Sequence, residues 1–296
     1  MEELERAQAR LDHIRTVEPI LSALRTISLG SWRATLKHSA SVQRYGEQLT
    51  AILPLLAPHL PAGRRARREI NPTPDRVVAL VIGSERGLCG RFNGAVVERA
   101  ERYLAEQETA GAQVELVALG TRARRIFQRR KRPLAWSGTL SIATLPPLHL
   151  AFHLTRRWLA RYEERELDAV DLIYNAYHGT GRYEPTVVRL IPPQLPPERQ
   201  NTLNEPWPPL IIETDPLSLY ARVVEQWAAI SLYGLLLDSA AAEHATRYQL
   251  MESATQNAVR LIEELTLAVQ AARRHAITQE MQELAAGAGL IGPRSS

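Results

Sequence analysis

The chain has 296 residues, of which 45% are hydrophobic and 23% are charged, and its formal net charge is +4. This composition allows a folded protein of one or two domains. Cys89 is the only cysteine, which excludes an intrachain disulfide and a cysteine-based zinc site. We expect neither a signal peptide nor a membrane span, because the amino terminus is charged and no run reaches about 18 apolar residues.

Residues 1–60 predict an amino-terminal helix with apolar side chains at helical spacing. Small residues follow at Ser28, Gly30, Ser31 and Ala34, where a neighbouring helix could approach closely. Pro19 removes one backbone hydrogen bond, so we expect a bend near residues 17–20 or a helix that restarts there. The apolar positions are Leu4, Ala7, Leu11, Ile14, Val17, Leu21, Leu24, Ile27, Val42, Tyr45, Leu49 and Ile52.

Three prolines predict the end of this helix. The arginine cluster and the proline-containing tetrapeptide that follow predict a linker. These residues are Pro54, Pro58, Pro61, Arg64, Arg65, Arg67, Arg68 and the tetrapeptide at 71–74.

Residues 75–195 predict a small doubly wound α/β domain, because short apolar strands alternate with helical segments. The run at 77–82, VVALVI, is typical of a buried parallel strand, and the loop at 83–90 leads from it into a helix. The segment 186–190 is expected to pair at an edge of the sheet. The expected strands are 77–82, 114–119, 170–175 and 186–190, and the expected helices are 93–107, 121–130 and 148–165.

Residues 210–290 follow an irregular proline-rich stretch (192–209) and are dominated by a predicted helix over 217–286. That helix contains no proline and one glycine, Gly234. At 1.5 Å per residue it would be about 100 Å long, more than the α/β domain could cover, so we expect it to project into a partner. Its second half repeats apolar or small residues at steps of three and four, the a/d seam of a coiled coil. The seam residues are Tyr248, Met251, Thr255, Ala258, Ile262, Leu265, Val269, Ala272 and Ala276.

The predicted fold class is therefore α plus α/β. The helices within 1–60 and 210–290 wind around each other as a long antiparallel coiled coil, and a small Rossmann-like α/β domain, residues 75–195, is inserted between them.

Three separated blocks of the sequence resemble the ATP synthase gamma subunit family. Residues 84–93, SERGLCGRFN, are similar to the family signature SDRGLCGGLN. Residues 172–175 and 184–187, LIYN and EPTV, match a family strand pair, and residues 240–287 follow the carboxyl-terminal pattern. Residues 15–33 align more loosely. The chain departs from the family pattern at Pro19, Thr26, Trp32, Arg91, Arg274 and His275.

This resemblance implies the central rotor shaft of an F-type ATP synthase. The paired helices would enter the head of α and β subunits, and the α/β domain would sit on the c-ring beside the epsilon subunit. Because two helices lack three-fold symmetry, the shaft would contact each β subunit differently and move it through its conformations in turn. The resemblance further implies a peripheral protein on the cytoplasmic side of the plasma or inner membrane, without catalytic site, cofactor or metal.

By the same resemblance, seven shaft residues are expected to contact the head. Arg247, Arg273 and Thr278 match positions that meet β-subunit loops, and Arg33 and Lys37 match positions that face the acidic lever segment of β. Thr26 and Arg274 lie in the same shaft segments. The plain alternative is a set of solvated polar residues. The signature residues are Arg86, Gly87, Leu88, Cys89, Gly90 and Asn93.

The glycines of the signature follow a strand, as in a nucleotide-binding loop, but their spacing fits neither G-x-G-x-x-G nor a P-loop. A tight strand-to-helix turn is the better interpretation, with Cys89 as a structural thiol because no histidine adjoins it. His149 and His153 lie one helical turn apart, yet no glutamate stands between them as H-E-x-x-H requires.

From the residues alone, two other functions stay open. A basic coiled-coil adaptor could bind nucleic acid or an acidic protein partner through the arginine clusters, the second of which covers 122–132. Nucleic acid is not expected, because no aromatic platform interleaves with these clusters. An enzyme built on the α/β domain ranks third, since that fold alone does not imply chemistry.

Overall fold

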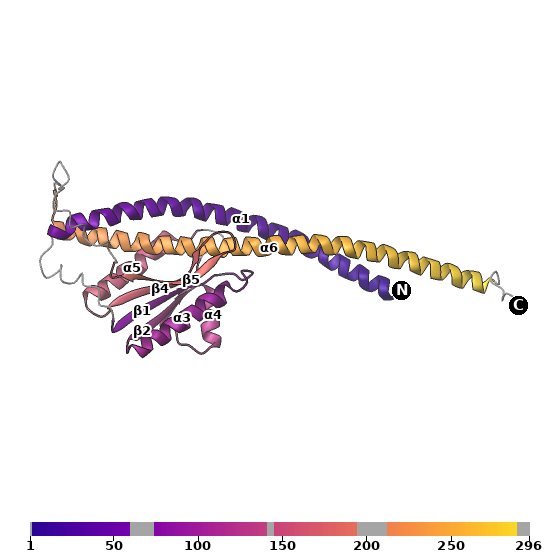
Figure 1. Cartoon of the computed structure of the whole chain (residues 1–296), viewed down its shortest axis with the longest axis horizontal. Coiled ribbons are helices and arrows are strands. Elements are labelled where there is room, and N and C mark those ends of the chain that lie inside the picture. The colour runs from indigo at the N-terminus through magenta and orange to yellow at the C-terminus, as the bar shows by residue number, and fades with distance from the viewer. Residues whose placement is uncertain (1, 60–73, 141–144, 194–211, 289–296) are drawn as a thin grey trace. The chain divides into compact units, whose positions relative to one another are not determined.

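The computed structural model describes residues 2–59, 74–140, 145–193 and 212–288 (Figure 1). The chain forms two compact units: residues 1–27 with 248–296, and residues 28–247. Helices α1 (Glu2–Leu56) and α6 (Pro216–Gly287) contribute to both units, whereas the sheet lies wholly in the second. No helix in the described parts of the chain is long and apolar enough to cross a bilayer.

In the first unit, the amino-terminal part of α1 lies beside the carboxyl-terminal part of α6. Arg25 Nη1 donates to Glu252 Oε2 at 3.1 Å and forms an ion pair across the two helices. Met251, Thr255 and Ala258 are buried, and the other predicted seam positions on α6 are half-buried, while most residues between them are exposed. The three-four rhythm therefore marks the inward side of α6, as the seam prediction requires.

Helix α1 continues through Pro19, so the predicted helix restart at that residue is wrong. Both Pro19 and Arg15 are exposed, and the Arg15 carbonyl, which loses its partner at the proline, can bond to water instead. The helix ends at Leu56, just before Pro58, and a short 3-10 helix follows, η1 (Ala57–His59). The cluster at 64–68, the first three residues of the tetrapeptide at 71–74 and residues 194–209 fall outside the described residues.

The second unit is built on a five-stranded sheet with the order β3-β2-β1-β4-β5. Strands β1 to β4 are parallel, and β5 pairs with β4 in the antiparallel direction at the edge, as predicted for residues 186–190. Strand β3 was not predicted, because three residues around one tryptophan carry no readable apolar run. The strands are β1 (Arg76–Ile82), β2 (Gln113–Leu119), β3 (Trp136–Gly138), β4 (Ala169–Tyr177) and β5 (Tyr183–Ile191).

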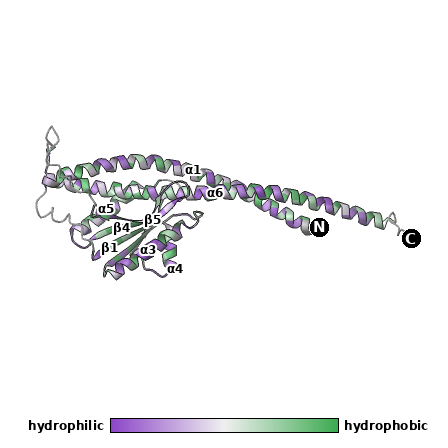
Figure 2. Ribbon diagram, viewed as in Figure 1, coloured by the Kyte–Doolittle hydropathy of each residue, from purple (hydrophilic) through white to green (hydrophobic). Residues whose placement is uncertain are grey.

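Helices cover both faces of this sheet, which confirms the predicted Rossmann-like domain. Helices α3 (Phe92–Thr109) and α4 (Thr121–Arg129) pack on one face through residues such as Val96 and Phe127. Helix α5 (Leu148–Glu163) and the first half of α6 cover the other face through Trp158 and Leu236. Figure 2 shows the strands as mostly hydrophobic, as expected for a sheet that is buried on both sides.

Within the second unit, α1 and α6 run antiparallel. Gly46 faces Ile230, and Trp227 Nε1 donates to Thr50 Oγ1 at 3.0 Å, so the residue number falls along α6 as it rises along α1. The buried cluster between the helices consists of Leu49, Leu53, Leu56, Val223 and Ile230. The apolar face that was predicted for α1 is only partly right, as the exposure of four residues shows. Ile27 and Ile52 are 62% and 38% exposed, and the small polar residues Ser28 and Thr35 are buried.

A buried polar triad joins α3 to the edge of the sheet. Asp171 of β4 is 2% exposed and lies opposite Arg189 of β5 in the strand register. Arg189 donates to both carboxylate oxygens from Nε and Nη2, each at 2.9 Å. Tyr103 of α3 donates its hydroxyl to Asp171 Oδ2 at 2.5 Å. Every described member of this triad thus has a polar partner in the otherwise apolar core.

Candidate functional site

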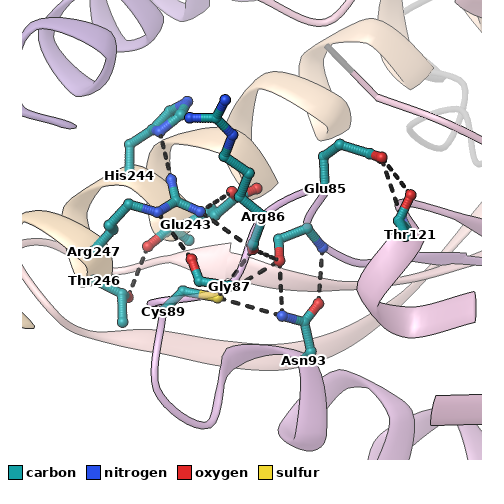
Figure 3. A network of polar contacts seen from close by, with 12 residues as sticks. Glu85, Arg86, Gly87, Cys89, Asn93, Thr121, Glu243, His244, Thr246 and Arg247 are labelled. Atoms are coloured by element: carbon teal, nitrogen blue, oxygen red, sulfur yellow. Dashed lines mark hydrogen bonds and ion pairs between the residues drawn. The ribbon is translucent and has the colours of Figure 1, made fainter. Parts of the chain in front are cut away.

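The signature segment, residues 84–93, forms the turn between β1 and α3 and is closed by hydrogen bonds among its own residues (Figure 3). Asn93 accepts a hydrogen bond from Ser84 N at 2.8 Å and donates from Nδ2 to Ser84 Oγ at 2.7 Å. The same Nδ2 lies 3.3 Å from Cys89 Sγ, and Ser84 Oγ donates to the Arg86 carbonyl at 2.6 Å. The segment is thus a self-supporting strand-to-helix turn, as its glycines predict.

Arg247 of α6 ties this turn to the neighbouring helix (Figure 3). Its side chain is buried, with Nε donating to the Gly87 carbonyl at 3.2 Å and Nη2 lying 3.5 Å from the Arg86 carbonyl. Nη1 donates to His244 Nδ1 at 3.2 Å, and Nη2 forms an ion pair with Glu243, one helical turn earlier. The Arg247 guanidinium therefore contacts two backbone carbonyls of the turn and two side chains of α6.

Burial sets the protonation of the groups around this guanidinium. Burial raises the pKa of Glu243, although the positive charge of Arg247 opposes the shift. Burial and then the Arg247 charge lower the pKa of His244 to about 4, so the imidazole is neutral and its Nδ1 can accept. Burial also raises the pKa of the Cys89 thiol, which is 1% exposed. A buried, protonated thiol fits the structural role expected for Cys89.

The half-buried side chain of Glu85 caps the amino terminus of α4. Its carboxylate accepts hydrogen bonds from Thr121 N and Leu140 N, each at 3.1 Å, and from the Thr121 hydroxyl. Burial raises the pKa of Glu85, but these hydrogen bonds outweigh burial and bring it below its ordinary value. The positive end of a helix dipole is where a phosphate often binds in α/β folds. Here a side chain of the chain itself occupies that position.

The crevice where α/β proteins usually bind ligands is also filled. In an open sheet of this type it lies at the carboxyl ends of the strands where the strand order reverses, here between β1 and β4. Asn175 Nδ2 donates to the Phe92 carbonyl at 2.8 Å across this point, and Tyr177 N donates to Asp238 of α6 at 3.2 Å. The cavity left between the turn and α6 measures about 30 Å³. A nucleotide needs a pocket of about 300–1,000 Å³.

Comparison with known proteins gives the family of the chain. The family model described as ATP synthase matches residues 3–289. A chain from Solibacter usitatus described as ATP synthase gamma chain is 29% identical over 285 residues, which cover 94% of this chain and 96% of that relative. The chain belongs to the ATP synthase gamma-chain family. Another relative of the same description, from Moorella thermoacetica, is 29% identical over 95% of this chain and 96% of its own length.

Chains in solved structures of ATP synthases share the fold. A chain of the Euglena gracilis mitochondrial ATP synthase (OSCP/F1/c-ring) superposes with a TM-score of 0.63 at 14% identity, over 99% of this chain and 98% of that one. A chain of the Tetrahymena thermophila ATP synthase central stalk/c-ring gives a TM-score of 0.58 at 20% identity, over 79% of this chain and 99% of that one. These matches give no support to the alternative of a basic coiled-coil adaptor.

The residues predicted to contact the head differ in their exposure in this family member. Thr26, Arg273, Arg274 and Thr278 are exposed in the first unit, and Arg33 and Lys37 are exposed in the second. Arg247 is buried and engaged within the chain. Of the signature residues, Arg86, Leu88 and Gly90 are exposed, Gly87 is half-buried, and Cys89 and Asn93 are buried. Contact with the head stays a prediction for the seven shaft residues.

Several residues of the site were not identified from the sequence. Glu243 was noted only as part of a family pattern, although an acidic and a basic residue four apart on a helix, here Glu243 and Arg247, predict an ion pair. Glu85 could not be found in this way, because its partners Thr121 and Leu140 lie far along the chain.

Replacing Gly83 by alanine is expected to destabilise the second unit by about 1–3 kcal/mol, because the core there is already full. A Cβ on Gly83 would lie 2.5 Å from Ala123 Cβ and 2.9 Å from Asn93 Oδ1. Gly94 is the matched control, because its Cβ would meet only the end of the Glu98 side chain, at 4.0 Å. Gly94→Ala should leave stability unchanged or raise it by up to about 1 kcal/mol. Urea denaturation of both variants measures the difference, and equal midpoints would contradict the prediction.

Proposed function

We propose that the chain is the central-stalk rotor subunit of an F-type ATP synthase, which couples ion flow through the membrane sector to the conformational cycle of the catalytic β subunits. The family match over residues 3–289 carries this proposal. The antiparallel packing of α1 and α6 supports it, since a rotor shaft needs two helices that stay paired under torque. Arg247 adds support, because it fastens the signature turn to the shaft helix.

We further propose that the shaft meets the α and β subunits of the head through its exposed polar residues. Arg33, Lys37, Arg273, Arg274, Thr26 and Thr278 carry this contact. Arg247, being buried, acts on the head through the signature turn, whose residues Arg86, Leu88 and Gly90 are exposed. Because two helices have no three-fold symmetry, each shaft orientation favours a different set of β conformations through unequal contact free energies. The α/β domain then faces the epsilon subunit and the c-ring.

The chain is also proposed to have no catalytic site of its own and to be peripheral to the inner or plasma membrane on its cytoplasmic side. The filled crevice between β1 and β4 supports the first part, because it leaves no room there for a nucleotide. In the described parts of the chain, no group of three or more histidine, cysteine, aspartate or glutamate residues could hold a metal ion.

Reconstitution tests this function. The chain is co-expressed with the α and β subunits of its own complex, with Arg102→Cys on the exposed side of α3 as a handle for a bead. Cys89 is buried and should not compete for the label. We expect an assembled ATPase whose bead rotates when ATP is added, and no hydrolysis by the chain alone. Failure to assemble, or a head that hydrolyses ATP while the bead stays still, would contradict the proposal.

A further inference from the structure

An aromatic contact within the second unit ties helix α1 to the end of strand β4. The rings of Trp32 on α1 and Tyr177 on β4 meet edge to face, with 6.3 Å between their centroids and 65° between their planes. Aromatic pairs prefer this kind of arrangement. Ser28 and Thr35, about one turn before and after Trp32, are small and buried, so α1 lies close to its neighbours here. Trp32 is thus the large side chain that reaches from this part of α1 to the sheet.

Tyr177 is itself held from two other directions. Its backbone N donates to Asp238 Oδ2 of α6 at 3.2 Å. Its side chain packs against the buried cluster around Phe92, which joins the signature turn to α6. The ring of Trp32 therefore contacts a residue whose position is fixed by both α6 and the signature turn.

A second contact holds α1 ten residues further along. Val42 packs against the core cluster that α6 shares with the sheet, and a Cβ built on Gly234 of α6 would lie 3.9 Å from Val42 Cγ1. Successive residues of an α-helix are turned by about 100° around its axis, so Trp32 and Val42 point about 80° apart and lie about 15 Å apart along the axis. A rotation of α1 about its own axis would therefore break at least one of the two contacts.

We propose that Trp32 is a positioning residue, which acts through Tyr177 to fix the rotation of α1 about its axis and thereby the direction of Arg33 and Lys37. Arg33 follows Trp32 directly and Lys37 lies five residues on, so they point about 100° and 140° away from Trp32 around the helix. Both are exposed, as a contact with another subunit requires. The inference rests on the proposed function, in which these two side chains meet the head.

The family resemblance does not imply this contact, because Trp32 is one of the positions at which the chain departs from the family pattern. A ring pair of this kind shifts an equilibrium by roughly two- to tenfold. Loss of the Trp32 ring should therefore raise the population of displaced α1 by about the same factor. The chain should stay folded, since the buried cluster around Leu53 and Val223 still joins the two helices.

Spin labels on the isolated full-length chain test the positioning without an assembled complex. The labels are attached to Lys37→Cys on α1 and Arg102→Cys on the exposed side of α3, and Cys89 is buried and should stay unlabelled. We expect a narrow distribution of distances in the parent chain and a broader one with Trp32→Ala. Trp32→Phe should restore the narrow distribution, because its ring can keep the contact. Ile52→Ala is the control, since it removes a large but exposed apolar side chain from the same helix.

Two outcomes of the spin-label measurement would overturn the proposal. A distribution as narrow with Trp32→Ala as in the parent chain would show that other contacts fix α1. Equal broadening by Ile52→Ala would show that any loss of apolar surface loosens the helix. Circular dichroism checks that each variant keeps its helices, so that broadening is not a sign of unfolding.

The reconstituted ATPase links the positioning to the proposed function. Lys37→Gln should slow bead rotation in the parent assembly, and its effect should shrink in a Trp32→Ala background, because a side chain without a fixed direction contributes less. A purely structural role of Trp32 would leave the two effects multiplicative, as for independent sites. Multiplicative effects would thus refute the role of Trp32 in the rotor. Failure of the parent chain to assemble would contradict the proposed function, while the spin-label result would still decide whether Trp32 fixes α1.

Discussion

Replacing Arg247 by alanine is expected to destabilise the second unit by about 3–5 kcal/mol, the usual loss when one partner of a buried ion pair is removed. The change leaves Glu243, whose side chain is only 14% exposed, without its counter-charge and removes the donors to the carbonyls of Arg86 and Gly87. Urea denaturation followed by circular dichroism measures the loss. Cys89 provides a local measurement, because its thiol is buried within the turn. The thiol should react faster with a thiol reagent once the turn has lost its bonds to Arg247.

The penalty of Arg247→Ala should depend on pH. Burial already raises the pKa of Glu243, and without the opposing Arg247 charge this pKa rises further in the folded state. The folded variant then binds more protons than the unfolded chain, so its stability falls as the pH rises through the shifted pKa. The gap between wild type and variant is therefore expected to be larger at pH 8 than at pH 5.

Arg260→Ala is the matched control for Arg247→Ala. Arg260 also pairs with a glutamate on the next turn of α6, with 3.8 Å between its Nε and Glu264 Oε1, but its side chain is 69% exposed. Removing it should change stability by no more than about 0.5 kcal/mol. If Arg247→Ala cost as little as Arg260→Ala and left Cys89 labelling unchanged, the assigned role of Arg247 would be wrong.

Replacing Arg189 by alanine is expected to cost about 3–5 kcal/mol for the same physical reason. Asp171, which is 2% exposed in the intact protein, would keep only the Tyr103 hydroxyl as a side-chain donor. Burial and the neighbouring Asp171 raise the pKa of Tyr103, so the phenol stays a neutral donor and cannot replace the lost positive charge. Thermal and urea unfolding measure the loss.

Two further variants separate charge from packing in this triad. Tyr103→Phe removes one hydrogen bond and should cost about 1 kcal/mol, with the ring still packed. Asp171→Leu combined with Arg189→Met removes both charges and should recover most of the stability lost by Arg189→Ala, because apolar pairs of similar volume often replace buried ion pairs without loss. A double variant as unstable as Arg189→Ala alone would show that shape, and not the unpaired carboxylate, dominates.

Features whose cause is local in the sequence were predictable. The run at 77–82 is apolar at every position because β1 is covered on both faces, and the seam from Tyr248 to Ala276 is periodic because one side of α6 faces inward. The glycines of the signature segment predicted the tight turn between β1 and α3. The resemblance to a known family added the function, which residue patterns alone left open among three classes.

Features that depend on distant partners were not predictable. Pro19 breaks a general rule of helix formation, yet its exposed position makes the lost hydrogen bond tolerable. Strand β3 is recognised only by its pairing with β2. Arg247 was expected to contact the head from the family resemblance, and its burial follows from its bonds to the carbonyls of residues 86 and 87, far away in the chain. No sequence pattern predicts which arginine donates to backbone carbonyls inside the protein.

Glu85 supplies the α/β domain with a permanent, covalently attached anion at the amino terminus of α4. Its carboxylate is tethered beside the first turn of α4, so its local concentration is fixed by the chain and does not follow the supply of free phosphate in the cell. In a stalk that works among adenine nucleotides, this arrangement leaves the amino terminus of α4 already paired with an anion. The first turn of α4 therefore keeps its counter-charge without a bound phosphate or nucleotide.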